Sequence, residues 1–290
     1  MASLLERTRI TLEMIKWEHS IFALPFALTG AVLAANGWPP FNKLLWIVVC
    51  MVSARSAAMA FNRLVDRRFD AANERTSSRA LPAGQLTPAF VTGFVALSAI
   101  VFLISAAMLN RLTMALAPVA LAVVLLYSYM KRITRWSHLI LGLALGIAPS
   151  AAWIAVRGDL RWPIVVLTVL VLLWVAGFDI LYACQDFEHD RRVGLHSIPQ
   201  AIGVDAAFRL ARGMHLAVIA LALWIDRLFH LGYIGLAGTM LVAVLLAYEH
   251  SIVRPDDLRR MNAAFFLLNG VISVIFLGFV TVAVLVMKHR

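Results

Sequence analysis

The sequence predicts an all-α integral membrane protein with nine transmembrane helices. The first reason is composition, because 62% of the 290 residues are hydrophobic and only 14% are charged. A soluble domain carries about a quarter charged residues. The second reason is that apolar segments of about 20 residues, the length of a membrane-spanning helix, recur along the whole chain. Membrane lipid is therefore the expected surrounding.

Nine apolar segments have the length of a transmembrane helix. The predicted spans are residues 20–37, 43–61, 89–109, 112–130, 138–156, 162–185, 207–226, 232–249 and 263–287. No polar stretch between them is long enough for a separate soluble domain. Residues 1–290 are therefore expected to form a single transmembrane domain.

The basic residues predict the orientation of these spans. The net charge is +10, which in a soluble protein would suggest nucleic acid as a partner. With nine spans, 18 Lys and Arg residues fall on the side of the N-terminus and seven on the other, and Arg55 lies inside a span. Cytoplasmic loops carry such an excess. We expect a multi-pass protein of a bacterial-type inner (plasma) membrane, with its N-terminus and acidic loops in the cytoplasm and no nucleic-acid partner.

The first acidic motif follows the second span. Asn62, Asp66 and Asp70 are spaced i, i+4, i+8, so they share one face if the helix continues past residue 61. Carboxylates at i and i+4 repel each other, and a divalent cation removes that penalty. Oxygen ligands select a hard ion, and Mg²⁺ binds through one or two carboxylates together with substrate phosphates.

The second acidic motif follows the sixth span. Asp186 and Asp190 repeat the i, i+4 pair, and Asp179 lies one heptad earlier, deeper in the membrane. An ionisable residue at such a depth is a candidate functional residue. A solvated helix end could explain one pair alone. Two pairs, each at the cytoplasmic end of a span, favour a duplicated half-site.

Charge balance indicates the ligand of these motifs. Four carboxylates offset two Mg²⁺ ions, and a diphosphate ester adds about three negative charges that cations must offset. Suitable cations lie in loops on the same side, namely Arg67, Arg75, Arg79, Lys131 and Arg132. Arg55 lies seven residues before Asn62, on the same face, and we favour a cavity-lining role for it over a structural one.

These residues resemble the UbiA superfamily of intramembrane prenyltransferases. The match rests on four motifs in family order that span essentially the whole chain: Asn62-x-x-x-Asp66-x-x-x-Asp70, Arg75-Thr76-x-x-Arg79-x-Leu81-Pro82-x-Gly84, Tyr127-x-x-Met130-Lys131-Arg132, and Asp179-x-x-Tyr182-x-x-x-Asp186-x-x-x-Asp190. The resemblance implies nine helices around a central cavity that is capped on the cytoplasmic side and opens to lipid for a prenyl tail.

The resemblance also implies substrates. It is strongest to enzymes that join a polyprenyl diphosphate to 4-hydroxybenzoate in ubiquinone biosynthesis. The opening segment from His19 to Phe26 is similar to a branch that acts on a dihydroxynaphthoate in menaquinone biosynthesis. The family often has Asn-Asp where this chain has Asn62-Arg63. This difference leaves the identity of the aromatic acid acceptor open but does not affect the reaction class.

The resemblance implies a role for each candidate residue. Two Mg²⁺ would be held by Asn62, Asp66, Asp70, Asp186 and Asp190, and the diphosphate by Arg67, Arg75, Arg79 and Lys131. The carboxylate of the acceptor would pair with Arg132, which we favour, or with Arg55. Tyr182 would line the acceptor site, and Asp179 would orient the phenol or accept its proton.

Two other classes are weighed against this reading. A secondary transporter would also carry intramembrane charges, but it would place them near the middle of the membrane. The acids of this chain instead gather at one face. A CDP-alcohol phosphotransferase would carry one compact motif on one pair of helices. This chain has two motifs, one at Asp66 and the other at Asp186.

Overall fold

The computed structural model describes residues 4–16, 23–258, 261 and 267–288. Within these residues the regular structure is helical, with no β-strand. Eight stretches are long and apolar enough to cross a membrane. They are formed by α3 (Phe41–Ala72), α4 (Pro88–Ala107), α5 (Arg111–Leu126) with α6 (Met130–Ile133), α7 (Ser137–Arg157), α8 (Trp162–Ala183) with α9 (Phe187–Val193), α11 (Val204–Leu228), α12 (Gly232–Ile252) and α14 (Asn269–Lys288).

A ninth apolar helix, α2 (Leu24–Ala35), has only 12 residues. The nine predicted spans fall on these nine segments, so the all-α membrane class is confirmed. Part of the first predicted span, and the start of the last, lie outside the described residues. The largest difference is in α3, which runs 11 residues beyond the predicted end at 61. Its extra three turns carry the first acidic motif.

Helix ends follow local chemistry. Thr87 caps α4, because its side chain accepts a hydrogen bond from the backbone N–H of Phe90 at 3.2 Å. Asn110 caps α5 in the same way, through the N–H of Thr113 at 2.9 Å. Helix α7 ends at Gly158, whose φ of +79° suits glycine. These caps explain why α4, α5 and α7 begin or end at the observed residues.

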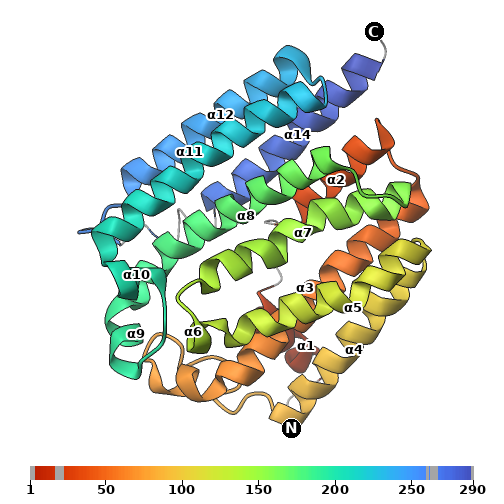
Figure 1. Ribbon diagram of the computed structural model, residues 1–290. Helices are drawn as coiled ribbons and strands as arrows, with labels where there is room; N and C mark the ends of the chain where they lie inside the picture. The colour runs from red at the N-terminus through yellow and green to blue at the C-terminus, as the bar shows by residue number, and fades with distance from the viewer. Residues whose placement is uncertain (1–3, 17–22, 259–260, 262–266, 289–290) are drawn as a thin grey trace.

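The helices form three neighbouring groups (Figure 1). Helices α2, α7 and α8 lie in the middle, with α3, α4 and α5 on one side and α11, α12 and α14 on the other. Helices α7 and α8 approach closely, because Gly142 and Gly146 lie against the backbone of α8 and leave no room for a Cβ atom. Small residues serve this purpose in membrane bundles.

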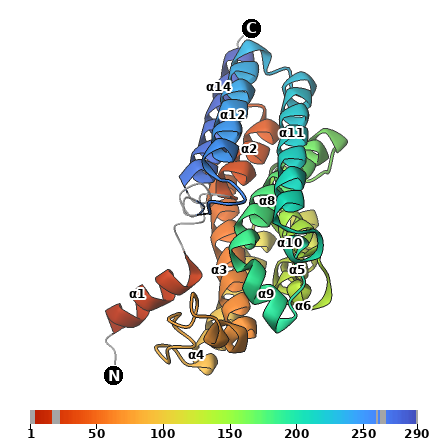
Figure 2. The same ribbon diagram turned by 90° about the vertical axis from the view of Figure 1, so that its left-hand side faces the viewer.

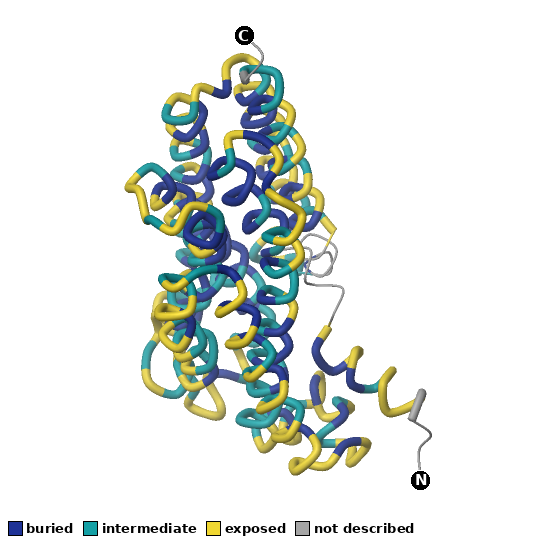
Figure 3. Tube along the Cα trace, turned by 90° about the vertical axis from the view of Figure 1, so that its right-hand side faces the viewer, coloured by how far each residue is buried: buried dark blue, intermediate teal, exposed yellow. Residues whose placement is uncertain are grey.

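Burial follows the same plan (Figure 3). The main core surrounds Trp174 of α8, whose ring lies 5.0 Å from that of Phe26 on α2. Many large apolar side chains point outward instead, and the most exposed include Leu97, Ile104, Val119 and Leu216. Outward apolar residues of this kind are expected when the surrounding is lipid. The chain is therefore a multi-pass membrane protein.

The short elements gather at one end of the bundle. Helix α9, α10 (Ile198–Ile202), α6 and the end of α3 lie close together there (Figure 1). The amphipathic helix α1 (Leu4–Ile15) projects from the same end (Figure 2) and packs Met14 and Ile15 near Ala60 and Leu64 of α3. This end carries both acidic motifs.

Candidate active site

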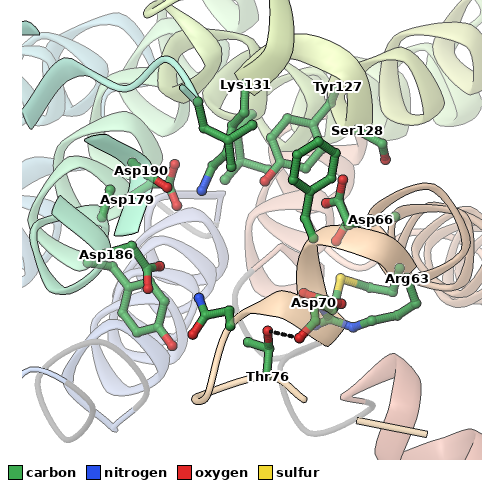
Figure 4. A pocket seen from close by; sticks show the side chains of 18 of the residues that line it. Arg63, Asp66, Asp70, Thr76, Tyr127, Ser128, Lys131, Asp179, Asp186 and Asp190 are labelled. Carbon is green, nitrogen blue, oxygen red and sulfur yellow. Dashed lines mark hydrogen bonds and ion pairs between the residues drawn. The ribbon is translucent and has the colours of Figure 1, made fainter. Parts of the chain in front are cut away.

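A cavity of about 300 Å³ opens at this end of the bundle. Its polar wall comes from the ends of α3, α8 and α9, from α6 and the 3₁₀ turn before it (Tyr127–Tyr129), and from the loop after α3 (Figure 4). Its inner wall is apolar and includes Leu141, Leu145, Val175 and Phe178. The two acidic motifs face each other across it (Figure 4). The cavity thus has a charged mouth and an apolar interior.

The first motif lies on the continuous helix α3, as its spacing predicts. Asn62 donates to Oδ2 of Asp66 at 3.0 Å, and Oδ1 of Asp66 accepts from Arg132 at 2.9 Å. One turn later, Oδ1 of Asp70 accepts from Arg79 at 2.6 Å. Thr76 closes the loop after the helix by donating to the backbone carbonyl of Asp70 at 3.0 Å. The loop therefore folds back onto the motif that precedes it.

The second motif spans a break in the helix. Asp179 lies on α8, Asp186 on a 3₁₀ turn (Cys184–Asp186), and Asp190 on α9. All three line the cavity. Asp190 is 2% exposed, which is unusual for an aspartate. The tighter turn between α8 and α9 thus keeps all three carboxylates on the wall of the cavity.

Arg75 joins the two motifs. Its guanidinium donates to Asp186 through Nε at 3.1 Å and through Nη2 at 2.7 Å. Its Nη1 also lies 3.3 Å from the hydroxyl of Tyr182. Burial by itself would lower the pKa of Arg75, but the negative charge of Asp186 and the Tyr182 hydroxyl outweigh burial and raise it. Arg75 is therefore a permanent cation at the mouth of the cavity.

Cations outnumber acids in the lining. Five aspartates line the cavity, and seven Lys and Arg residues line it with them, namely Lys16, Arg55, Arg63, Arg75, Arg79, Lys131 and Arg132. The imbalance leaves a net charge of +2 before any ligand binds. An anionic ligand with several oxygens, such as a diphosphate, suits this surplus.

Two carboxylate oxygens also suit a hard cation. Asp70 Oδ2 and Asp190 Oδ2 are buried and have no hydrogen-bond partner, although Arg63 lies 4.0 Å from the former. Buried polar atoms are normally satisfied. Across the described ranges, no three His, Cys, Asp or Glu side chains converge closely enough to hold a metal by themselves. The donor set fits Mg²⁺ held by carboxylates together with ligand phosphates, as Mg²⁺ usually is.

The structure brings most predicted site residues together. Asn62, all five aspartates, Arg55, Arg75, Arg79, Lys131, Arg132 and Tyr182 line one cavity. Arg67 is the exception, because it is exposed outside that lining and donates to the carbonyl of Leu64 at 3.0 Å. One residue after Asp66, a helical side chain turns about 100° away from the cavity.

Arg132 lines the cavity beside the first acidic motif. Its guanidinium is held by Asp66 and by the carbonyl of Val65, and it lies 4.7 Å above the ring of Phe69. These contacts attach Arg132 to the first acidic motif. Arg55 lies about three helical turns before Asp66 on α3 and also lines the cavity. The two arginines therefore line different depths of one cavity.

Sequence reasoning missed several cavity residues. Arg63 and Tyr127 line the cavity, and Arg63 faces Asp70. Both residues lie inside sequence motifs that were already recognised, and this position could have identified them as cavity residues. Buried His138, which holds Asp179 from behind at 2.6 Å, left a weaker signal. It is a histidine at the very start of a predicted span.

Paired acidic motifs around a cation-rich cavity, set in a bundle of membrane helices, define an intramembrane enzyme of the prenyltransferase class. Residues 23–271 match the model of the UbiA prenyltransferase family, and the chain belongs to that family. It is 31% identical to a 4-hydroxybenzoate octaprenyltransferase of Hydrogenovibrio crunogenus, over 87% of this chain and 88% of that one. A relative of the same name from Vibrio campbellii is 31% identical over 85% and 87%.

Solved structures agree with this assignment. A UbiA homolog from Aeropyrum pernix K1, in its apo form, matches with a TM-score of 0.83 and 31% identity, over 94% of this chain and 98% of that one. A UbiA homolog from Archaeoglobus fulgidus, bound to GPP and Mg²⁺, matches with a TM-score of 0.70 over 95% and 99%. Its identity is 15%, so it supports the fold alone. The expected family is confirmed, and the transporter and phosphotransferase readings are set aside.

Proposed function

We propose that this protein transfers a polyprenyl group from a polyprenyl diphosphate to an aromatic acid, with 4-hydroxybenzoate as the acceptor, in ubiquinone biosynthesis. The observation that carries the proposal is the cavity itself, in which two acidic motifs and seven cations surround one space above an apolar interior. The curated relatives are named for transfer to 4-hydroxybenzoate. A single transmembrane domain, residues 1–290, carries out this reaction.

The diphosphate binds at the mouth of the cavity. Asn62, Asp66, Asp70, Asp186 and Asp190 would hold Mg²⁺ there, and the buried oxygens of Asp70 and Asp190 support this assignment. Bound Mg²⁺ would neutralise the diphosphate and stabilise the charge that develops on its leaving oxygen. Arg75, Arg79, Lys131 and Arg132 contribute further positive charge on the same wall.

The acceptor binds deeper than the diphosphate. Arg55 precedes Asn62 by seven residues on α3, and Asp179 precedes Asp186 by seven on the opposite wall. Each therefore lies about 10 Å further in. We assign the acceptor carboxylate to Arg55, because Arg55 lines the cavity deeper than Asp66, to which Arg132 donates. Arginine suits a carboxylate because its planar fork donates two hydrogen bonds.

Asp179 then acts on the phenol. It takes the phenol proton, and the ring carbon ortho to that oxygen bonds to the allylic carbon while the C–O bond to the diphosphate breaks. The bonding electrons leave with the diphosphate. The ring carbon next loses its hydrogen as a proton to the departing diphosphate, and Asp179 returns a proton to the oxygen. Atoms and charge balance, and the aromatic ring is restored.

The inner wall protects the reacting carbon from water. Leu141, Leu145, Val175 and Phe178 line the cavity beyond Asp179, and such a wall offers no hydrogen bonds to solvent. Water would otherwise react with the allylic carbon as positive charge develops on it. The same apolar surface suits the prenyl chain, whose remaining length would leave the cavity into lipid.

Transfer assays test the proposal directly. Purified protein is incubated with geranyl diphosphate and Mg²⁺ against a panel of hydroxybenzoates and dihydroxynaphthoates, and products are identified by mass spectrometry. We expect a prenylated 4-hydroxybenzoate. Preference for a dihydroxynaphthoate would assign the protein to the menaquinone branch that the segment from His19 to Phe26 resembles. No transfer to any acceptor would overturn the proposed reaction.

A further inference from the structure

A buried histidine lies behind the cavity wall, where α7 packs on α8. His138 is 0% exposed, and its Nδ1 lies 2.6 Å from Oδ2 of Asp179. Its other ring nitrogen, Nε2, lies 3.3 Å from the backbone nitrogen of Ile198. His138 does not line the cavity, but Asp179 does. It can therefore act on a substrate only through Asp179.

The two contacts fix the protonation state of the ring. A backbone N–H can only donate, so Nε2 of His138 must present its lone pair to Ile198. The single proton of the neutral ring is then on Nδ1, from which it is donated to Asp179. A doubly protonated ring would place a second N–H against the N–H of Ile198. The two contacts thus select the tautomer of His138 that carries its proton on Nδ1.

This pairing differs from those of three other aspartates in the cavity. The others each meet an arginine, in the pairs Asp66–Arg132 at 2.9 Å, Asp70–Arg79 at 2.6 Å and Asp186–Arg75 at 2.7 Å. An arginine stays charged, so it neutralises its partner. The imidazole of His138 instead fixes the direction of the Asp179 carboxylate through one hydrogen bond. Among these four aspartates, Asp179 is therefore the one that a histidine orients.

The loop after α9 holds the histidine in register with the second acidic motif. The N–H of Leu195 donates to the carbonyl of Asp190 at 3.0 Å, and that of His196 donates to the carbonyl of Lys131 at 2.7 Å. Two residues later, Ile198 reaches His138. One short segment therefore joins α6, α7 and α9, and it sets the place of His138 relative to the diphosphate site.

We propose that His138 is a positioning residue for the acceptor half of the reaction, holding the carboxylate of Asp179 directed at the phenol of the acceptor. This inference rests on the proposed function. It assigns to the loop at Ile198 a role in setting the tautomer of His138. It also explains why a polar group is buried on the apolar side of α7, since an unpaired histidine there would be unfavourable.

Two substitutions separate positioning from packing. His138→Leu fills the site but cannot donate, whereas His138→Asn keeps an N–H close to the position of Nδ1. With 4-hydroxybenzoate, His138→Leu should lower kcat about 10- to 100-fold, the rate equivalent of one hydrogen bond to a charged group. His138→Asn should restore most of this loss. The KM for geranyl diphosphate should stay unchanged in both variants, which reports that the protein is folded.

A more acidic acceptor provides the second readout. A fluorine beside the phenol oxygen, as in 3-fluoro-4-hydroxybenzoate, lowers the pKa of that phenol and reduces its need for a base. The deficit of His138→Leu relative to the wild-type protein should therefore shrink with this acceptor, as should that of Asp179→Asn. The deficit of Arg75→Lys, on the diphosphate side, should not.

The outcomes distinguish the inference from the function it rests on. A wild-type protein that prenylates no acceptor contradicts the proposed function. A wild-type protein that works, with a His138→Leu variant equally active, overturns the inference alone. So does a loss that is the same with both acceptors and is not restored by His138→Asn, because a packing defect would behave in that way.

Discussion

Arg75 and Asp186 are 111 residues apart in the chain, yet the guanidinium of one meets the carboxylate of the other at 2.7 Å. Arg75 belongs to the loop that follows the first acidic motif, and Asp186 belongs to the second. The contact therefore joins the two halves of the site across the cavity. A phosphate oxygen placed between the motifs would compete with Asp186 for the same guanidinium. The guanidinium of Arg75 is thus placed to exchange the carboxylate of Asp186 for a phosphate of the substrate.

This contact yields the first prediction. Arg75→Lys keeps the positive charge and loses the planar fork, whereas Arg75→Ala loses both. We expect the KM for geranyl diphosphate to rise more than tenfold in the alanine variant and less in the lysine variant, since a lost charged pair is worth about 2–5 kcal/mol. Steady-state assays at saturating acceptor measure both. An unchanged KM in Arg75→Ala would remove Arg75 from the diphosphate site.

The second prediction concerns the metal. Asp66→Asn and Asp190→Asn should abolish turnover while the protein still inserts into membranes and purifies as the wild type does. The amide keeps the size of the side chain and removes the charge that a hard cation needs. Asp205→Asn is the matched control, because Asp205 is exposed on α11 and does not line the cavity.

Removal of metal tests the same point without mutation. Activity should need Mg²⁺ or Mn²⁺, vanish when a chelator is added, and return when excess Mg²⁺ is supplied. Initial rates across a titration of the metal measure this dependence. Full activity in the presence of chelator would contradict a metal-bound diphosphate.

Local patterns predicted much of this architecture, since span length and charge bias reflect the membrane itself. The i, i+4 spacing of Asp66 and Asp70 required only that α3 continue, and it does. The sequence places Arg67 among the cations near the diphosphate because it lies on the same side of the membrane as the acidic motifs. The helix turns its side chain away from the cavity lining.

Tertiary partners could not be predicted in the same way. The position of Arg132 depends on how the end of α5 and α6 meets α3, where Asp66 holds it. The partner of Asp179 is 41 residues away, on α7, and is set by helix packing and by a loop hydrogen bond. No periodicity in a single sequence encodes such pairings. They arise when two helices pack.

The third prediction concerns orientation. Reporter fusions after residues 85 and 195 should read cytoplasmic, and a fusion at 290 should read external. Residue 85 lies in the loop between α3 and α4, and residue 195 follows α9, so both lie at the end of the bundle that carries the acidic motifs. The excess of basic residues on that side supports the assignment. A cytoplasmic signal from the fusion at 290 would overturn nine crossings.

The last prediction separates the two arginines that can meet the acceptor carboxylate. An aromatic acid that enters the membrane must pair its carboxylate, because an unpaired charge does not leave water. Arg132 donates to Asp66 at 2.9 Å and so belongs with the first acidic motif, whereas Arg55 lines the cavity about three turns deeper on the same helix as Asp66. Arg55 and Asp179 both line the cavity beyond the acidic motifs, where the phenol is expected.

We accordingly expect Arg55→Ala to raise the KM for the acceptor more than tenfold and to leave the KM for the diphosphate nearly unchanged. Arg132→Ala should do the reverse. Arg55→Lys is the matched control, since it keeps the charge and cannot donate two parallel hydrogen bonds, and it should fall between the alanine variant and the wild type. Steady-state kinetics with each substrate varied in turn measure the acceptor KM and the diphosphate KM of every variant. If Arg132→Ala raises the acceptor KM instead, the carboxylate lies at the mouth of the cavity beside Asp66, and the deeper acceptor site is wrong.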